Sequence, residues 1–195
     1  MKIARARFVK SAVSPEQFPA GQFPEIAFVG RSNVGKSSLI NSLLVSPGLA
    51  KTSSTPGRTQ LINFFQVNDG FYFVDLPGYG YARVPLEIKR SWGPMVQGYL
   101  ATRANLVLVV VITDARHEPA KLDLQMTEWL QSRGKPFIVV ATKSDKLSAN
   151  KLKANLARLS GAFSGATVIP YSSVTRLGTD QVWREIVSAA NVQHG

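Results

Sequence analysis

The sequence contains no cysteine, only two histidines and few acidic residues. The absence of cysteine excludes disulfides and thiolate metal sites, and it is typical of proteins in a reducing compartment. His117 and His194 are too few for a zinc cluster. The longest fully apolar run, residues 106–112, is far shorter than the roughly 20 residues that a transmembrane helix needs. No long apolar run follows the basic start either, so we expect no signal peptide, no membrane association and a cytoplasmic protein.

The shortage of acidic residues leaves a strong positive charge. The chain carries 23 Lys and Arg against 12 Asp and Glu, a formal net charge of +11. This balance favours a polyanionic partner, and RNA is the first candidate. Basic residues are concentrated in the first ten positions and again over residues 146–176, a stretch without any acidic residue. We predict that these stretches contact RNA phosphates. A solvated basic face without a ligand is the alternative.

Short apolar runs alternate with stretches of helical spacing. The apolar runs predict strands over residues 25–29, 60–67, 71–75, 106–112, 137–141 and 167–170. The helical spacing predicts helices over residues 36–44, 86–102, 121–132, 150–159 and 179–190. The Asp69-Gly70 pair between two of the strands indicates a hairpin. This order predicts an α/β three-layer sandwich around a mostly parallel six-stranded sheet with one antiparallel edge strand.

The length of 195 residues suits one domain with a substantial core. Residues 12–24 contain three prolines and a glycine and indicate a lead-in loop, and residues 6–9 are compatible with a short edge strand. We therefore predict that residues 1–24 form a basic N-terminal extension with a lead-in loop. Residues 25–195 then form a single folded domain.

A phosphate-binding loop lies between the first predicted buried strand and the helix that follows it. Residues 30–37 match the P-loop pattern G-x-x-x-x-G-K-S. In such a loop, backbone N–H groups surround the phosphates, the lysine reaches the β- and γ-phosphates, and the serine hydroxyl binds Mg²⁺. The predicted nucleotide contacts are Gly30, Arg31, Ser32, Asn33, Val34, Gly35, Lys36, Ser37 and Ser38.

Two further loops are expected at the γ-phosphate. Residues 75–78, D-L-P-G, end a predicted strand, and a carboxylate there can hold Mg²⁺ through a water. A hydroxyl from the loop before residue 60 completes the Mg²⁺ shell, and we favour Thr59 over Thr55. We assign the catalytic roles to Lys36, Thr59 and Gly78. The remaining predicted contacts in these loops are Gly57, Arg58, Gln60, Leu61, Asp75, Leu76 and Pro77.

Residues 142–145, T-K-S-D, end another predicted strand and select the base. The Asp145 carboxylate can accept hydrogen bonds from guanine N1–H and the exocyclic amine, and adenine offers no such pair. This preference argues against an ATPase or a small-molecule kinase, although an ordinary charged loop is the alternative interpretation. Backbone N–H groups of residues 171–173 are expected at the guanine carbonyl. The predicted base contacts are Thr142, Lys143, Ser144, Asp145, Tyr171, Ser172 and Ser173.

With these motifs in order, the chain resembles a translation-factor-type GTPase with a Ras-like G domain in residues 25–195. The finer match, T-P-G-R-T-Q at 55–60, N-F-F at 63–65, D-L-P-G-Y-G-Y-A at 75–82 and T-K-S-D, resembles the EngB/YihA/YsxC family. This resemblance implies a bacterial GTPase acting in large ribosomal subunit assembly, with a link to cell division and septation. It also implies Ser37 and Thr59 as Mg²⁺ ligands and the ribosomal subunit or its precursor as partner. We expect a monomer.

Two residues depart from the broader GTPase pattern. Thr142 replaces the usual Asn of N-K-x-D, which predicts modest base affinity. Tyr79 follows Gly78 where Ras-type proteins have a water-orienting Gln, so we predict slow unaided hydrolysis that a partner or an ion stimulates. Asn33 is a candidate K⁺ ligand, with a loop-stabilising role as the alternative. The second functional hypothesis is a nucleotide-gated RNA- or ribosome-binding module whose hydrolysis is incidental.

Overall fold

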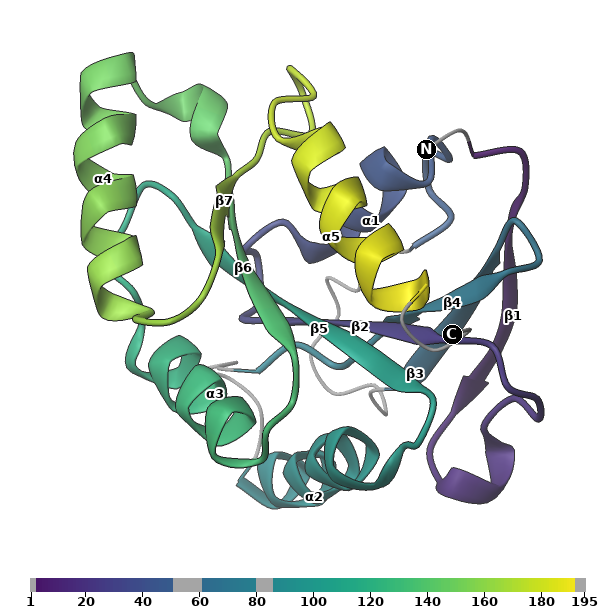
Figure 1. Cartoon of the computed structure of the whole chain (residues 1–195). Coiled ribbons are helices and arrows are strands. Elements are labelled where there is room, and N and C mark those ends of the chain that lie inside the picture. Colours follow the sequence, from purple (N-terminus) through teal and green to yellow (C-terminus); the bar gives the residue numbers. More distant parts are fainter. Residues whose placement is uncertain (1–2, 51–60, 80–85, 192–195) are drawn as a thin grey trace.

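The computed structural model describes residues 3–50, 61–79 and 86–191. Strands and helices alternate along these residues (Figure 1). The strands are β1 (Ala6–Ala12), β2 (Glu25–Gly30), β3 (Ile62–Val67), β4 (Phe71–Asp75), β5 (Leu106–Asp114), β6 (Phe137–Thr142) and β7 (Val168–Pro170). The α-helices are α1 (Lys36–Leu43), α2 (Leu86–Thr102), α3 (Lys121–Ser132), α4 (Ala149–Ala162) and α5 (Thr179–Asn191), and Pro15–Gln17 and Ser144–Lys146 form short 3₁₀ turns.

The sheet has the strand order β1-β3-β4-β2-β5-β6-β7. The strands from β4 to β7 are mutually parallel, whereas β3 pairs antiparallel with both β4 and β1. The predicted mostly parallel sheet with antiparallel pairing at one edge is therefore confirmed, with seven strands instead of six. The additional strand is β1, which pairs along β3 from Ala6 opposite Val67 to Ala12 opposite Ile62. Its short and largely exposed sequence carries a weak strand pattern, and pairing with β3 stabilises it.

The predicted hairpin joins β3 to β4. Asn68 and Asp69 both have positive φ angles, 49° and 51°, as the tight turn of a twisted hairpin requires. The Gly70 N–H donates to the Val67 carbonyl at 3.0 Å and closes the turn. The hairpin is confirmed, but the pair with positive φ is Asn68-Asp69 and not the predicted Asp69-Gly70. Asn and Asp tolerate this backbone region better than most residues.

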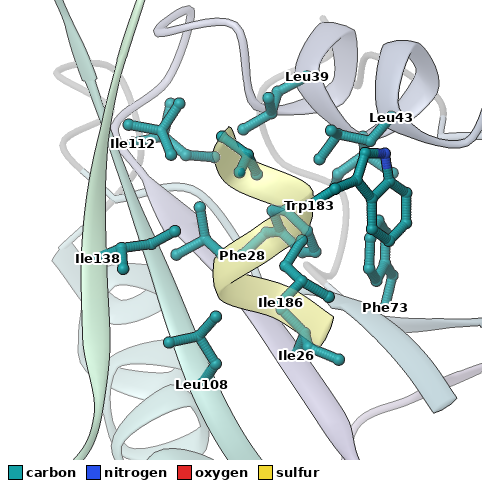
Figure 2. Packing of buried hydrophobic residues seen from close by; sticks show 14 of the residues in the cluster. Ile26, Phe28, Leu39, Leu43, Phe73, Leu108, Ile112, Ile138, Trp183 and Ile186 are labelled. Atoms are coloured by element: carbon teal, nitrogen blue, oxygen red, sulfur yellow. The ribbon is translucent and has the colours of Figure 1, made fainter. Parts of the chain in front are cut away.

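Helices cover both faces of the sheet. In β2, Ile26 and Phe28 point into the layer beneath α1 and α5, whereas Ala27 and Val29 point into the layer beneath α2, α3 and α4. Figure 2 shows the first layer, in which Trp183 of α5 lies over Phe73 with ring centroids 5.6 Å apart. Buried side chains of this size contribute about 1.5–3 kcal/mol each. The three-layer sandwich is confirmed.

The parallel strands all end at one edge of the sheet. In an open α/β sheet, ligands bind at this edge, where neighbouring strands have connections that leave in opposite directions. Strand β2 lies at such a point, with β4 on one side and β5 on the other. Among the helices that the structure describes, none is long and apolar enough to cross a bilayer.

Candidate functional site

The sheet brings the predicted motifs together at the carboxyl ends of the parallel strands. The P-loop follows β2, the D-x-x-G residues follow β4, the T-K-S-D residues span the end of β6, and residues 171–173 follow β7. Four motifs separated by up to about 140 positions thus line one edge. The described part of the site is built from the carboxyl ends of these strands, the loops that follow them and the first turn of α1.

Two glycines allow the P-loop to turn from β2 into α1. Gly35 precedes the helix with a φ of 99°, a conformation that side chains rarely adopt, and its carbonyl accepts the Leu39 N–H at 2.8 Å. A Cβ on Gly30 would lie 2.9 Å from the Ile112 carbonyl oxygen, so the loop passes too close to β5 for a side chain. Helix α1 therefore begins directly after the loop, and the N–H groups of its first turn favour binding of an anion there.

The phosphate-binding lysine lies beside the D-x-x-G carboxylate. The Lys36 ammonium forms an ion pair with the Asp75 carboxylate, and both side chains are largely buried. Gly78, three residues further, packs against the P-loop backbone. The structure therefore joins three residues that were predicted at the γ-phosphate and Mg²⁺: Lys36, Asp75 and Gly78.

The T-K-S-D residues contact the P-loop through two side chains. The buried Thr142 hydroxyl lies within hydrogen-bond distance of the carbonyl oxygens of Val34 and Thr113, at 3.0 Å for the latter. The Lys143 ammonium donates to the Asn33 carbonyl at 2.6 Å. The Thr142 hydroxyl thus holds β6 to the P-loop, and the base contact of Thr142 stays a prediction.

Asp114, at the end of β5, is a site residue that the sequence analysis missed. Its carboxylate accepts hydrogen bonds from Arg116 and from Lys143 Nζ, the latter at 2.9 Å. Burial opposes the ionised form, but these hydrogen bonds outweigh it and hold the pKa of Asp114 well below its usual range. The available signal was an acidic residue two positions after the continuous apolar run of residues 106–112.

A buried serine orients the predicted base-selecting carboxylate. The Ser172 hydroxyl donates to Asp145 Oδ1 at 2.7 Å and accepts the backbone N–H groups of Val174 and Thr175 at 3.2 and 3.1 Å. The Ser172 bond, assisted by Lys146, lowers the pKa of Asp145. Both oxygens of a fully ionised carboxylate are then acceptors, as a guanine N1–H and amine pair requires.

Ser144 and Tyr171 join the same two loops. The Ser144 N–H donates to the Tyr171 carbonyl at 3.1 Å, and the Ser144 hydroxyl accepts the Tyr171 N–H at 3.1 Å. The Tyr171 hydroxyl reaches Ser42 of α1 at 2.9 Å. The backbone N–H groups of residues 171–173 were predicted at the guanine carbonyl, but those of Tyr171 and Ser172 donate to the carbonyls of Ala141 and Leu177 at 2.8 and 3.1 Å, and Ser173 lies exposed beside them.

Four of the predicted nucleotide contacts cannot be placed in this structure. Gly57, Arg58, Thr59 and Gln60 are outside the described residues, and Leu61 is exposed directly before β3. In the described part of the chain, no three His, Cys, Asp or Glu side chains form a group that could hold a metal ion.

Comparisons with known proteins point to one family. The model of a family described as 50S ribosome-binding GTPase matches residues 25–143. A probable GTP-binding protein EngB from Geobacter metallireducens is 50% identical over 189 residues, covering 95% of this chain and 92% of that protein. A probable GTP-binding protein EngB from Desulforamulus reducens is 61% identical over 152 residues, 77% and 74% of the two chains. The crystal structure of a probable GTP-binding protein engB matches with a TM-score of 0.72 at 23% identity, covering 86% and 98%, which shows the likeness of fold.

Proposed function

Because the chain belongs to the EngB family of GTP-binding proteins and is a GTPase, we propose that it hydrolyses GTP as a switch in large ribosomal subunit assembly. The family description, 50S ribosome-binding GTPase, supports the ribosomal part of this proposal. The observation that carries the nucleotide part is the convergence of P-loop, D-x-x-G and T-K-S-D residues at one sheet edge. Co-sedimentation of the protein with large ribosomal subunits in the presence of GTP or GDP tests the proposal. Equal binding to the subunits with either nucleotide would contradict it.

The nucleotide roles follow from the positions of these residues. P-loop N–H groups and Lys36 bind the phosphates. The Asp145 carboxylate accepts hydrogen bonds from guanine N1–H and the exocyclic amine. The Lys143 stem lies against the purine. We expect GDP to bind more tightly than ADP, because adenine would leave the Asp145 carboxylate without donors. Competition of GDP and ADP for a fluorescent nucleotide measures this, and an ADP preference would overturn the assignment.

Mg²⁺ is the cofactor that these side chains fit. Hard divalent cations prefer oxygen ligands, and Mg²⁺ is usually bound by one or two protein oxygens together with phosphates. The Ser37 hydroxyl and Thr59 are the proposed direct ligands, with Asp75 acting through a water. When bound, the ion neutralises charge on the β- and γ-phosphates. The ion pair of Asp75 with Lys36 places an acidic oxygen beside the phosphate-binding lysine. In Asp75→Asn, Mg²⁺ should increase GTP affinity less than it does in the unaltered protein. Measuring GTP binding during a Mg²⁺ titration tests this.

The basic surface of α4 is the proposed RNA contact. Lys151 and Lys153 are exposed and form no ion pair within the described residues, whereas Arg158 is paired with Glu118. The two lysines are therefore available for backbone phosphates. Reversing both to Glu should weaken subunit binding and reduce its salt dependence. The matched control reverses Lys121 and Lys135, which changes the net charge equally. If both double variants bind alike, the assignment to α4 fails.

A K⁺ ion near Asn33 is the proposed stimulant of hydrolysis. Asn33 is exposed in the P-loop with a φ of 64°, and its main-chain carbonyl accepts a hydrogen bond from the Lys143 ammonium. A cation there would offset the lack of a water-orienting Gln at Tyr79. GTP turnover in KCl should exceed that in NaCl at equal ionic strength. Equal rates would remove the ion from the proposal.

The second candidate function is a nucleotide-gated binding module whose hydrolysis is incidental. The replacement of Gln by Tyr79 favours it, since that residue has no amide with which to orient water. Single-turnover hydrolysis with and without large-subunit precursors separates the two functions. Stimulation by precursors supports the enzyme switch, and an unchanged rate supports the binding module.

The cellular setting of the proposal is a cytoplasmic monomer with an associated role in cell division and septation. Depletion should cause large-subunit precursors to accumulate before cells elongate without dividing. Gradient sedimentation and microscopy of the same culture measure the order of these events. Elongation with normal subunits would separate division from ribosome assembly.

A further inference from the structure

A carboxylate is buried beneath the P-loop, outside the predicted site. Asp123 lies in the first turn of α3 and is fully buried. It accepts the Tyr79 hydroxyl at Oδ1, 2.9 Å away, and the Thr113 hydroxyl at Oδ2, 3.0 Å away. Arg31 of the P-loop forms an ion pair with the same carboxylate, with Nε 3.5 Å from Oδ2. One side chain of α3 thus connects β5, the P-loop and the residue after the D-x-x-G motif.

Tyr79 is also fixed to the P-loop through its main chain. Its N–H donates to the Gly30 carbonyl at 3.2 Å, and its carbonyl accepts the Ser32 N–H at 3.1 Å. These bonds form an isolated parallel bridge between Arg31 and Tyr79. Tyr79 is therefore held at three points: the N–H, the carbonyl and the hydroxyl. The residue before it is Gly78, whose N–H we assign to the γ-phosphate.

The Tyr79 ring is directed away from the nucleotide edge. The side chain is only 9% exposed and packs in the apolar layer beneath α2, α3 and α4. The ring therefore does not occupy the place of a water-orienting side chain. The Tyr79 hydroxyl binds Asp123 and does not contact the nucleotide. Any effect of Tyr79 on hydrolysis must therefore come from the position of the Gly78–Tyr79 backbone.

The cost of this carboxylate argues for a positional role. Burial raises the pKa of Asp123, because a charged oxygen loses its hydration, while the Tyr79 hydroxyl and Arg31 oppose the rise. A buried ionic group usually contributes less stability than apolar residues of equal volume. In the described residues, Arg31 Nε has no hydrogen-bond partner, so even the pairing is incomplete. An apolar contact would stabilise this layer better but would not fix the orientation of Tyr79.

We propose that Asp123 is a positioning residue for GTP hydrolysis, which acts through Tyr79 to hold the Gly78 N–H against the P-loop. This inference rests on the GTPase activity alone and does not depend on the ribosomal role. Without the hydroxyl anchor, Tyr79 keeps its two backbone bonds, but its ring and the peptide that joins it to Gly78 are less constrained. Small displacements of a group at the reacting phosphate reduce the rate much more than they reduce binding.

The structure contains a matched control for this anchor. The Tyr99 hydroxyl donates to the fully buried Glu25 carboxylate at 2.7 Å, and Arg103 binds the same carboxylate. Tyr79 and Tyr99 pack in the same apolar layer. Glu25 begins strand β2, however, whereas the P-loop leaves from its other end at Gly30. Removing either tyrosine hydroxyl therefore breaks the same kind of bond, near the site in one case and far from it in the other.

The test compares Tyr79→Phe with Tyr99→Phe in the purified full chain, without ribosomes. Both variants should lower the melting temperature by similar amounts. Single-turnover GTP hydrolysis in KCl with Mg²⁺ should fall about tenfold in Tyr79→Phe, with GDP affinity within about twofold of the unaltered protein. Tyr99→Phe should hydrolyse at the unaltered rate. An unchanged rate in Tyr79→Phe, or an equal loss in both variants, would overturn the proposal.

A second variant addresses Asp123 itself. Asp123→Asn keeps the shape and one acceptor for Tyr79 but loses the charge that attracts Arg31. Its hydrolysis rate should lie between those of the unaltered protein and Asp123→Ala, with nucleotide affinity again little changed. If Asp123→Ala does not fold, the hydrolysis rates of Asp123→Asn and Tyr79→Phe still test the positioning role of Asp123. An Asp123→Asn variant that binds GDP weakly and hydrolyses bound GTP at the normal rate would place Asp123 in binding rather than positioning.

Discussion

Replacing Ser172 by Ala removes a single oxygen that has three hydrogen bonds. The Ser172 hydroxyl donates to Asp145 at 2.7 Å and accepts two backbone N–H groups, and Ser172 has no exposed surface. Water therefore cannot take the place of the lost oxygen without rearrangement. The variant should loosen both the base-selecting carboxylate and the loop after β7.

The magnitude follows from the type of bond that is lost. A hydrogen bond to a charged group contributes about 1.5–3 kcal/mol. Asp145 keeps a contact with Lys146 at 3.2 Å, but that lysine is largely exposed and holds the carboxylate weakly. Because this contact remains, we expect a loss near the lower bound, about 1.5 kcal/mol, which weakens guanine nucleotide binding about tenfold. Loss of the acceptor for the two N–H groups should cost about 1 kcal/mol of folding stability.

Displacement of a fluorescent GDP analogue by GDP and by ADP measures the effect. GDP affinity should fall about tenfold while the weak ADP affinity changes little, because only guanine uses Asp145. Ser11→Ala is the control, since it removes a hydroxyl bond to Asn63 of the same 2.7 Å length on the edge strand β1. Normal GDP affinity in a folded Ser172→Ala protein would refute the claim that Ser172 orients Asp145.

Three further substitutions test other parts of the structure. Glu25→Gln leaves Arg103 without its buried carboxylate and should cost about 3 kcal/mol of unfolding free energy in urea; a loss below about 1 kcal/mol would show that water replaces the pair. Asp114 has a pKa below its ordinary value, so its ionised form stabilises the fold above about pH 4, and this contribution is lost as acid protonates it. Asp114→Asn should therefore lower the melting temperature at pH 7 and flatten its fall below pH 4, whereas parallel curves would contradict the assignment. Gly35→Ala forces a side chain into a φ of 99°, which costs about 1–2 kcal/mol and should weaken GDP and GTP binding together in equilibrium titrations; selective loss of one nucleotide would point to another cause.

Several parts of the site were predictable because they depend on neighbouring residues. The pattern of residues 30–37 between an apolar run and a helical stretch predicts a P-loop, and the structure has that loop between β2 and α1. Asp69-Gly70 predicts the hairpin, because the turn depends on the backbone preferences of adjacent residues. The ends of the helices and strands were also close to the predicted positions, since apolar periodicity reflects which side chains are buried.

Other parts became visible only when distant residues met. Residues 6–9 were compatible with a short edge strand, but only pairing with the open edge of β3 shows that residues 6–12 form the seventh strand of the sheet. The Thr142 hydroxyl contacts the P-loop carbonyl of Val34, a residue 108 positions earlier. Asp114 carried no motif, and its role depends on Lys143, which lies 29 positions later.

The sequence by itself determined that this chain binds a guanine nucleotide, because each motif is a short run whose chemistry is contained in its own residues and their spacing. Only the tertiary structure decided how those motifs are held relative to one another. Asp123 reaches Tyr79 across 44 positions, and Ser172 reaches Asp145 across 27. Such pairs leave no periodic or compositional trace, since a hydrogen bond depends on the final positions of two side chains and not on the residues beside them.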